Sequence, residues 1–419
     1  MIITGYDQYN ILIERMNRED CIIIPIFRDI HFHRMENTYL CVGVAFITGD
    51  TFIVSITHKD APMFEVPTGN KCLSVDNIHA LAYVNNKSFP EMEYTPYAHD
   101  THNKFGNSTD VNKLIPLTIW GKIITQYAKE LLVIFKEHNS DINSQKMNFA
   151  TSLLDTLQTI ESSGLCVNKT LLEEHFGAKT TRAFKHNLVY SEYNPYTATN
   201  RPSNRFGGIN FSALSKSDGS RDTFISRYEN GCLVQFDFEA YHLRLIADIL
   251  EVQLPVENSI HMELAKIYFN TDIITDELYS QSKSKTFEIM YGMSNETYGF
   301  ELFEKIHMMR AMFKDETTIE LPSGMIVSVD QPNASKLFNY YMQSLEMVQT
   351  LPKLQRILNL LKNTNNKLIL YTYDSILLDM ETFDSAVAED IISILEENKK
   401  FPVRMYSGNT YNNIKEIRL

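Results

Sequence analysis

The sequence predicts an α+β protein of more than one packed unit. Residues 21–57 alternate apolar runs with short polar turns, which is typical of antiparallel strands joined by tight turns. From about Ile115 to Lys136 the apolar residues recur at the three- and four-residue spacing of a helix. A chain of 419 residues is too long for one ordinary hydrophobic core, so two or three units are expected.

Further along the chain, strands and helices again alternate. Residues 148–163 form an amphipathic pattern that ends at Gly164, a residue suited to a helix C-cap. The segment from about Lys179 to Glu229 is rich in Asn, Ser, Gly and Arg and predicts loops. The remaining expected elements are a strand CLVQFDF (232–238) that runs into a helix (241–250), a long helical stretch over Glu257–Tyr291, a helix over Asn333–Lys362 and a β-hairpin KLILYTYDSILLDM (367–380).

Composition excludes several classes of protein. Apolar residues make up 44% of the chain, and Gly and Pro number only 16 and 13, which excludes a collagen-like or extended disordered chain. The apolar runs are far shorter than the roughly 20 residues that a membrane helix requires, and the N-terminus lacks signal-peptide features. The five cysteines lack zinc-ligand spacing and are expected to be buried free thiols. We therefore expect a cytoplasmic protein with no membrane partner.

Positive charge is concentrated in one part of an acidic chain. The net charge of −13 argues weakly against a protein coated with nucleic acid, because phosphate binding relies on Lys and Arg. Between Phe176 and Asn230, however, eight cations accompany four acidic residues. These cations are Lys179, Arg182, Lys185, Arg201, Arg205, Lys216, Arg221 and Arg227. A local basic track of this kind could contact phosphates.

Two predicted strands each place an aspartate at an end or turn. Asp237 lies near the end of LVQFDF, and Asp374 lies at the turn of LILYTYDSILLD. A carboxylate in an apolar strand is costly to bury unless a cation neutralises it. Two such carboxylates side by side could hold two Mg²⁺ ions about 4 Å apart, as in phosphoryl transfer. Either aspartate alone would be interpreted as a turn cap, and the surrounding motifs change that interpretation.

These motifs resemble those of family A DNA polymerases from about residue 148 onward, in the same order. QFDFEAYHLRLIADIL is similar to motif A, YSQSKSKTFEIMYGM to motif B and YTYDSILLD to motif C. The resemblance implies a polymerase palm with an antiparallel sheet and helical fingers, which adds dNTPs to the primer 3′ end of a DNA primer–template. It implies Asp237 and Asp374 as catalytic residues, and these two with Phe238 as ligands of two Mg²⁺ ions.

The resemblance also implies a nucleotide site. Motif B places Lys283, Phe287 and Tyr291 at four-residue spacing on one helix face, with Lys285 as an alternative for the phosphate role. IHMELAKIYF resembles the fingers segment whose histidine meets the triphosphate, here His261. Without the motifs, these residues would be interpreted as solvated charges, packed polar groups or core aromatics.

A primer–template site is implied by three shorter segments. TATNRPSN, FNYYMQSLEM and motif C resemble segments that contact the duplex near its growing end. The corresponding residues are Thr199, Arg201, Asn339, Gln343 and Tyr373. Asn339 and Gln343 could instead form only the polar face of an amphipathic helix.

The motifs depart from the family pattern at several positions. His242 stands where motif A has a glutamate that helps to exclude ribonucleotides, so His242 is counted as nucleotide-binding and sugar choice stays open. Tyr279 replaces the first arginine of motif B, so a cation for the triphosphate is missing or supplied elsewhere. Ser375 replaces the glutamate of motif C. Only 35 positions separate Gly164 from Thr199 (199 − 164), which implies a shortened thumb and a processivity partner that replaces it.

Three parts are expected. Residues 1–145 are expected to form a degenerate exonuclease-like α+β domain (ribonuclease H-like), 146–200 a reduced thumb, and 201–419 the palm and fingers, with fingers at about 256–330. The first strand ends in Arg28-Asp29-Ile30-His31 without an Asp-x-Glu pair. AHDTHNKF (98–105) faintly resembles the second exonuclease motif, with Gly106 where a metal-binding aspartate is expected.

Two alternative functions stay open beside a short, divergent phage or viral replication polymerase. His242 favours a single-subunit RNA polymerase or primase-like enzyme on the same palm. Tyr279 and the missing thumb favour a catalytically silent polymerase-like subunit. Retention of Asp237, Asp374 and Lys283 argues against the silent subunit.

Overall fold

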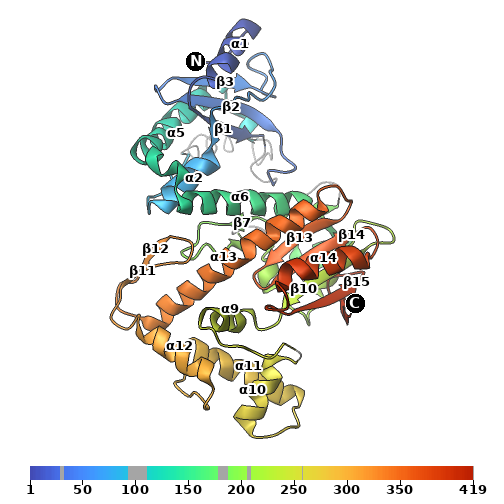
Figure 1. Cartoon of the computed structure of the whole chain (residues 1–419). Coiled ribbons are helices and arrows are strands. Elements are labelled where there is room, and N and C mark those ends of the chain that lie inside the picture. Colours follow the sequence, from blue (N-terminus) through green and yellow to red (C-terminus); the bar gives the residue numbers. More distant parts are fainter. Residues whose placement is uncertain (29–32, 93–110, 178–186, 205–208, 257, 419) are drawn as a thin grey trace. The chain divides into compact units, whose positions relative to one another are not determined.

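The computed structural model describes most of the chain and divides it into two compact units (Figure 1). The first is built from described residues up to Thr151 and the second from described residues beginning at Ser152. The described ranges are 1–28, 33–92, 111–177, 187–204, 209–256 and 258–418. Asp29–His31 and residues 98–106, on which the degenerate exonuclease motifs were predicted, lie outside them.

The first unit contains a four-stranded mixed sheet in the order β3-β2-β1-β4. Strands β1, β2 and β3 are antiparallel, and β4 is parallel to β1. The strands are β1 (Cys21–Phe27), β2 (Tyr39–Phe46), β3 (Thr51–Ser55) and β4 (Cys72–Ser74). The helices are α1 (Tyr6–Met16), α2 (Val75–Val84), α4 (Val111–Leu114), α5 (Leu117–His138) and the 3₁₀ helix η1 (Asn139–Asn143). The predicted hairpins and the long helix are therefore confirmed.

Helix α5 covers this sheet at close range. It contacts β1, β2 and β3, and its buried residues recur at helical spacing, including Trp120, Ile124 and Leu131. At Gly43 in β2 the helix comes so near that an added Cβ would collide with the Ile124 side chain. Glycine is thus required there for the helix to lie flat on the strand.

The second unit begins within α6 and continues through short elements. α6 starts in the first unit, and Gly164 follows its last residue with φ of +60°, as its predicted C-cap role requires. The elements up to the central sheet are α6 (Gln145–Ser163), β5 (Leu165–Val167), α7 (Lys169–Phe176), β6 (Leu188–Val189), β7 (Tyr193–Asn194), β8 (Ser203–Asn204), η2 (Phe211–Ala213), η3 (Ser220–Thr223) and β9 (Phe224–Ile225). In the described part of 165–199 the only helix is α7, so the shortened thumb stays a prediction.

A five-stranded antiparallel sheet forms the centre of the second unit, in the order β13-β14-β10-β15-β16. Its strands are β10 (Cys232–Phe238), β13 (Lys367–Thr372), β14 (Ser375–Met380), β15 (Val403–Gly408) and β16 (Lys415–Ile417). Helix α13 (Ala334–Leu361) contacts β13, and α14 (Ser385–Glu396) contacts β15. The strand-to-helix turn predicted after Phe238 is confirmed, with α9 (Tyr241–Ile249) packing on α13.

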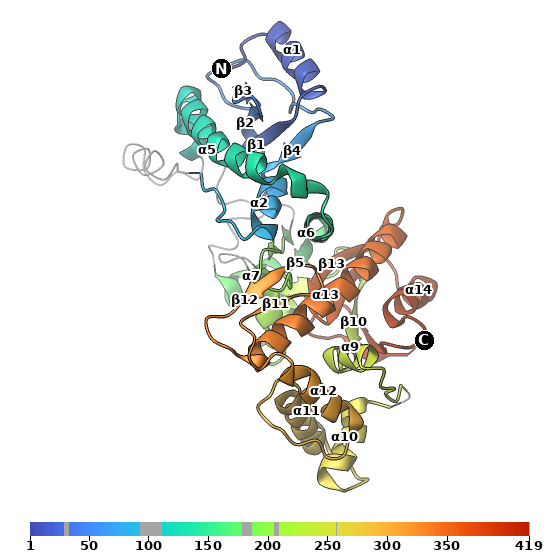
Figure 2. The same cartoon turned by 60° about the vertical axis from the view of Figure 1, so that its left-hand side comes forward.

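Three helices cluster beside α9 and α13 within this unit, as both views show (Figures 1 and 2). They are α10 (Ile260–Phe269), α11 (Asp276–Met290) and α12 (Glu301–Ala311), followed by the hairpin β11 (Thr318–Glu320) and β12 (Ile326–Ser328). The single helical stretch predicted over 257–291 was wrong, because it is broken between α10 and α11. Asn270 adopts the left-handed conformation that ends a helix, and the Thr275 side chain caps the next one.

Two further expectations from composition can be compared with the structure. All five cysteines are free, but only Cys21 and Cys41 are buried, so the expectation that all are buried was wrong. No helix among the described residues combines the length and the apolar character needed to cross a membrane.

Candidate active site

The two predicted catalytic aspartates lie side by side at one end of the central sheet. Asp237 on β10 pairs in register with Ser375, the first residue of β14. Asp374 precedes Ser375 in the β13–β14 turn, where Tyr373 has a left-handed φ of +63°. The main-chain N–H of Phe238 donates to the carbonyl of Asp374 at 2.9 Å. The tight turn and this bond hold both carboxylates at the same edge.

Burial and a neighbouring carboxylate raise the pKa of each of the two aspartates. The pKa of Asp237 is raised to about 6, first by burial and then by the neighbouring Asp374, while Lys216, Lys283 and Arg404 act in the opposite direction. The pKa of Asp374 is also raised, first by burial and then by Glu346. An arrangement of this kind is relieved by a bound cation.

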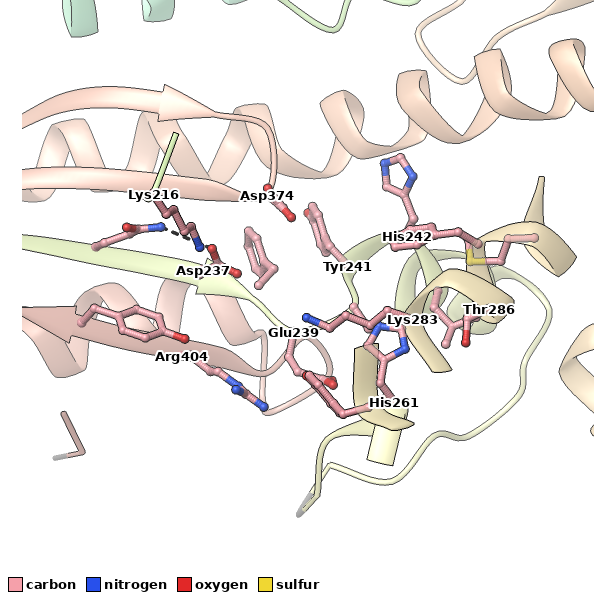
Figure 3. Close-up of a pocket in the computed structure, with 18 of the residues that line it drawn as sticks. Lys216, Asp237, Glu239, Tyr241, His242, His261, Lys283, Thr286, Asp374 and Arg404 are labelled. Atoms are coloured by element: carbon pink, nitrogen blue, oxygen red, sulfur yellow. Dashed lines mark hydrogen bonds between the residues drawn. The ribbon is translucent and has the colours of Figure 1, made fainter. Parts of the chain in front are cut away.

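A cavity of about 540 Å³ opens above these aspartates (Figure 3). Nine residues predicted from the sequence line it: Arg201, Asp237, Phe238, His242, His261, Lys283, Phe287, Tyr291 and Asp374. Four others, Thr199, Asn339, Gln343 and Tyr373, are not among the lining residues. The structure thus brings the predicted nucleotide-binding set together at one cavity.

Helix α11 presents the motif B residues to this cavity. Phe287 and Tyr291 stack nearly parallel, with ring centroids 6.2 Å apart. Lys283 Nζ lies 4.8 Å from the centroid of the Tyr279 ring. Lys285 does not line the cavity, and its Nζ donates to the Tyr298 hydroxyl at 3.1 Å. Of the two lysines considered for the phosphate role, only Lys283 therefore faces the cavity.

His261 on α10 is a buried polar residue with one ring nitrogen that makes no hydrogen bond among the described residues. Its side chain is 5% exposed, and its Nδ1 forms no hydrogen bond with the described residues. Burial is the main cause that lowers its pKa to about 4, against the opposing effect of Glu239. The imidazole is therefore neutral at pH 7, and its Nδ1 can form one hydrogen bond with a ligand in the cavity.

The buried carboxylate of Glu346 contacts two residues that line the cavity, His242 and Arg201. Glu346 of α13 is fully buried, and its Oε2 lies 2.6 Å from His242 Nε2 and 3.1 Å from Arg201 Nε. His242 Nδ1 forms a short hydrogen bond with the Tyr291 hydroxyl. The Arg201 guanidinium in turn lies 3.8 Å from the centroid of the Tyr373 ring. Glu346 thus orients both His242 and Arg201.

The other predicted primer–template residues form a separate chain of hydrogen bonds. Thr199 Oγ1 donates to Gln343 Oε1 at 3.0 Å, and Gln343 Nε2 donates to Asn339 Oδ1 at 3.2 Å. Thr199 is buried. These residues lie together, although outside the lining of the cavity.

The predicted basic track is smaller than its residue count suggested. Arg227 was wrongly included, because its Nε donates to the fully buried Asp379 at 2.8 Å. Arg201, Lys216 and Arg221 line the cavity. The other members, Lys179, Arg182, Lys185 and Arg205, lie outside the described residues.

Sequence reasoning missed several residues that shape the site. Glu239 and Arg244 form a buried ion pair, and Glu239 Oε1 also accepts the main-chain N–H of Ile260 at 3.0 Å. This pair fastens the start of α10 to α9. Glu346 resembled any polar residue of a long helix, and Arg404 was a lone cation in a short strand, so neither gave a local signal.

The protein donors fit magnesium. Mg²⁺ is usually held by one or two carboxylates with waters and substrate phosphates, so it needs no complete protein cage. Asp237 and Asp374 supply the two carboxylates, and the main-chain carbonyl of Phe238 is the third donor that the resemblance implies. Across the described parts of the chain, no cluster of three or more His, Cys, Asp or Glu side chains is placed to hold a metal.

Comparison with known proteins was informative only at the level of structure. No family model matches the chain, and no curated protein matches its sequence. Among solved structures, it is similar to the POL domain of Pol1 from M. smegmatis in complex with DNA primer–template and dNTP. The TM-score is 0.70 with 10% identity, and the match covers 99% of each chain. The chain has the fold of a polymerase domain. The predicted α+β class with antiparallel sheets is thereby confirmed.

Proposed function

We propose that this chain is a DNA-templated DNA polymerase, which joins dNTPs to a primer 3′ end by two-metal phosphoryl transfer. The observation that carries the proposal is the pair Asp237 and Asp374, held side by side beneath a cavity that also receives His261 and Lys283. The polymerase fold of the chain supports the same activity.

Seven of the lining residues have a part in this reaction. Asp237, Asp374 and the Phe238 carbonyl would hold two Mg²⁺ ions. When bound, these ions would activate the primer hydroxyl and neutralise charge on the phosphates. Lys283 places a cation on the phosphates. Neutral His261 offers its free Nδ1 position to a phosphate oxygen. The stacked rings of Phe287 and Tyr291 offer a flat apolar surface to the base.

The duplex would lie on the side of Asp374 and Tyr373. Arg201 is stacked on Tyr373, and the hydrogen-bonded set Thr199, Gln343 and Asn339 supplies polar groups for the groove near the primer end. Because only 35 positions separate Gly164 from Thr199, where the family has its thumb, we propose that a processivity partner takes over the role of the thumb. Replication of a phage or viral genome is the process that we propose, because motifs A, B and C diverge from the family pattern at His242, Tyr279 and Ser375.

A second candidate is an RNA-synthesising enzyme on the same palm. The observation that favours it is His242, which lines the cavity where a carboxylate is expected and is held between Glu346 and Tyr291.

Primer extension with Mg²⁺ tests both candidates. Wild type is compared with Asp237→Asn and with Asp390→Asn, whose exposed aspartate lies on α14. We expect extension with dNTPs by wild type and by Asp390→Asn, and none by Asp237→Asn. Extension with rNTPs in preference to dNTPs would favour the second candidate. Extension with neither would contradict polymerase activity and favour the silent subunit.

A further inference from the structure

Arg404 lies directly beside Asp237 in the central sheet. Strands β10 and β15 are antiparallel and place these two residues opposite each other, so their side chains project from the same face. On the other side of Asp237 lies β14, preceded by Asp374. Arg404 and Asp374 therefore flank Asp237 on opposite sides, and Arg404 lines the same cavity (Figure 3).

The Arg404 guanidinium is half-buried beside Asp237, its neighbour across the sheet. Burial acts to lower the pKa of Arg404, while the hydroxyls of Tyr279 and Tyr406 and the Glu416 carboxylate act to raise it, and the net shift is upward. No carboxylate within the described ranges forms an ion pair with it. Because a guanidinium presents five donors in a planar fork, an arginine left in this condition beside a cavity is suited to bind a phosphate.

Cations and an imidazole gather around Tyr279 on this side of the cavity. The Tyr279 ring lies beneath Lys283 Nζ and close enough to Arg404 to act on its pKa. The adjacent His261 is only 5% exposed, and its Nδ1 has no hydrogen-bond partner among the described residues. Two cations and one unsatisfied imidazole nitrogen thus converge from β15, α11 and α10.

We propose that Arg404 binds the outer phosphates of the incoming nucleoside triphosphate, opposite Lys283, and so supplies from the sheet the cation that Tyr279 does not supply from α11. This inference rests on the proposed function for the identity of the ligand. If the primer end lies on the Asp374 side, the triphosphate tail must extend past Asp237 toward β15. Arg404 projects from that strand, and Lys216 is a further cation that lines the cavity near Asp237.

Calorimetric titration of the full chain tests the proposal without requiring catalysis. The probes are inorganic tripolyphosphate, a dNTP and the matching dNMP, each with Mg²⁺. Arg404→Ala should weaken binding of the first two by about tenfold, the usual effect of losing one charged hydrogen-bonding partner. Binding of the dNMP should stay unchanged, because it has no outer phosphates. Arg356→Ala, which removes an exposed arginine of α13, is the control and should match wild type.

Two further variants keep the test decisive. Arg404→Gln retains a polar side chain of similar length, so it should fold as wild type while showing the same loss as Arg404→Ala. In the double variant Arg404→Ala with Tyr279→Arg, the new guanidinium on α11 should restore most of the tripolyphosphate affinity. A double variant no better than Arg404→Ala would overturn the exchange of roles between these positions.

Two results separate failure of this inference from failure of the proposed function. Tripolyphosphate and dNTP affinities unchanged in both Arg404→Ala and Arg404→Gln would overturn the inference, whatever the wild type does with a primer. If these variants lose affinity for tripolyphosphate and dNTP but the wild type extends no primer, the phosphate site would be supported and the polymerase activity contradicted.

Discussion

His242 Nε2 and Glu346 Oε2 lie 2.6 Å apart, and this hydrogen bond fixes an imidazole that lines the cavity. If Nε2 carries the proton and donates to the carboxylate, Nδ1 of a neutral ring accepts from the Tyr291 hydroxyl. The same Glu346 oxygen forms an ion pair with Arg201, whose Nε lies 3.1 Å away. One buried carboxylate therefore couples α9, α11 and the segment before β8.

Glu346→Gln should lower the free energy of unfolding by about 1–3 kcal/mol, because the hydrogen bond with His242 and the ion pair with Arg201 lose their buried anion. Urea unfolding measures this change. The control Glu389→Gln alters an exposed residue of α14 and should leave the midpoint in place. An equally small shift in both variants would show that the Glu346 carboxylate contributes little to stability.

Lys283→Ala should raise the apparent KM for dNTP and lower turnover, on the order of tenfold in kcat/KM, since Lys283 lines the cavity in which we propose that the phosphates bind. Lys285→Ala is the matched control, because Lys285 lies two positions away on the same helix and contacts Tyr298 instead. Steady-state extension kinetics compare the two. Damage confined to Lys285→Ala would transfer the phosphate role to that residue.

The local elements of the fold could be predicted from the sequence because their signals are short-range. The strand of Asp237 and the hairpin of Asp374 showed as apolar runs with one polar interruption, and α5 and α13 showed as periodic patterns. The break at Asn270 was missed, because a left-handed residue inside a helical composition has no strong signature. Its outcome depends on how α10 and α11 pack, which the sequence does not display.

The long-range relationships could not be predicted in the same way. Arg404 becomes part of the site only because β15 pairs with β10, across more than 160 positions of chain (404 − 237 = 167). Glu346 looked like a polar residue of an amphipathic helix until Arg201 and His242 were placed against it. Arg227 looked like a free cation until Asp379 was found beside it. Pairings between distant segments decide which charges are structural.

Asp237→Asn should stabilise the metal-free protein at neutral pH. The folded-state pKa of about 6 exceeds the ordinary value of 3.8, so the folded state holds the proton more tightly and loses stability as pH rises through this window. The variant avoids that loss, with a gain of about 2–3 kcal/mol at pH 7.5. Urea unfolding in EDTA should show the gain shrinking as pH is lowered from 6 toward 4. A gain independent of pH would contradict the assignment of the shift to Asp237.

The chain alone should release DNA quickly and be sensitive to salt. Duplex affinity depends on neutralisation of the DNA phosphates and falls steeply with salt. One cation of the basic track, Arg227, is already paired with Asp379. Short products are therefore expected at physiological salt with excess template, and longer ones when a partner raises the effective concentration. Long products from one binding event, measured with a trap, would show that the chain grips DNA unaided.

Incorporation of one nucleotide opposite a defined template base tests the central claim most directly. Wild type, Asp374→Asn and the exposed control Asp390→Asn are each mixed with primer–template, Mg²⁺ and one dNTP at a time. We expect wild type and Asp390→Asn to add only the complementary dNTP, and Asp374→Asn to add it at least about 1000-fold more slowly, because a proposed ligand of the two Mg²⁺ ions is lost. Incorporation by Asp374→Asn at the wild-type rate, or addition that ignores the template base, would contradict the central claim.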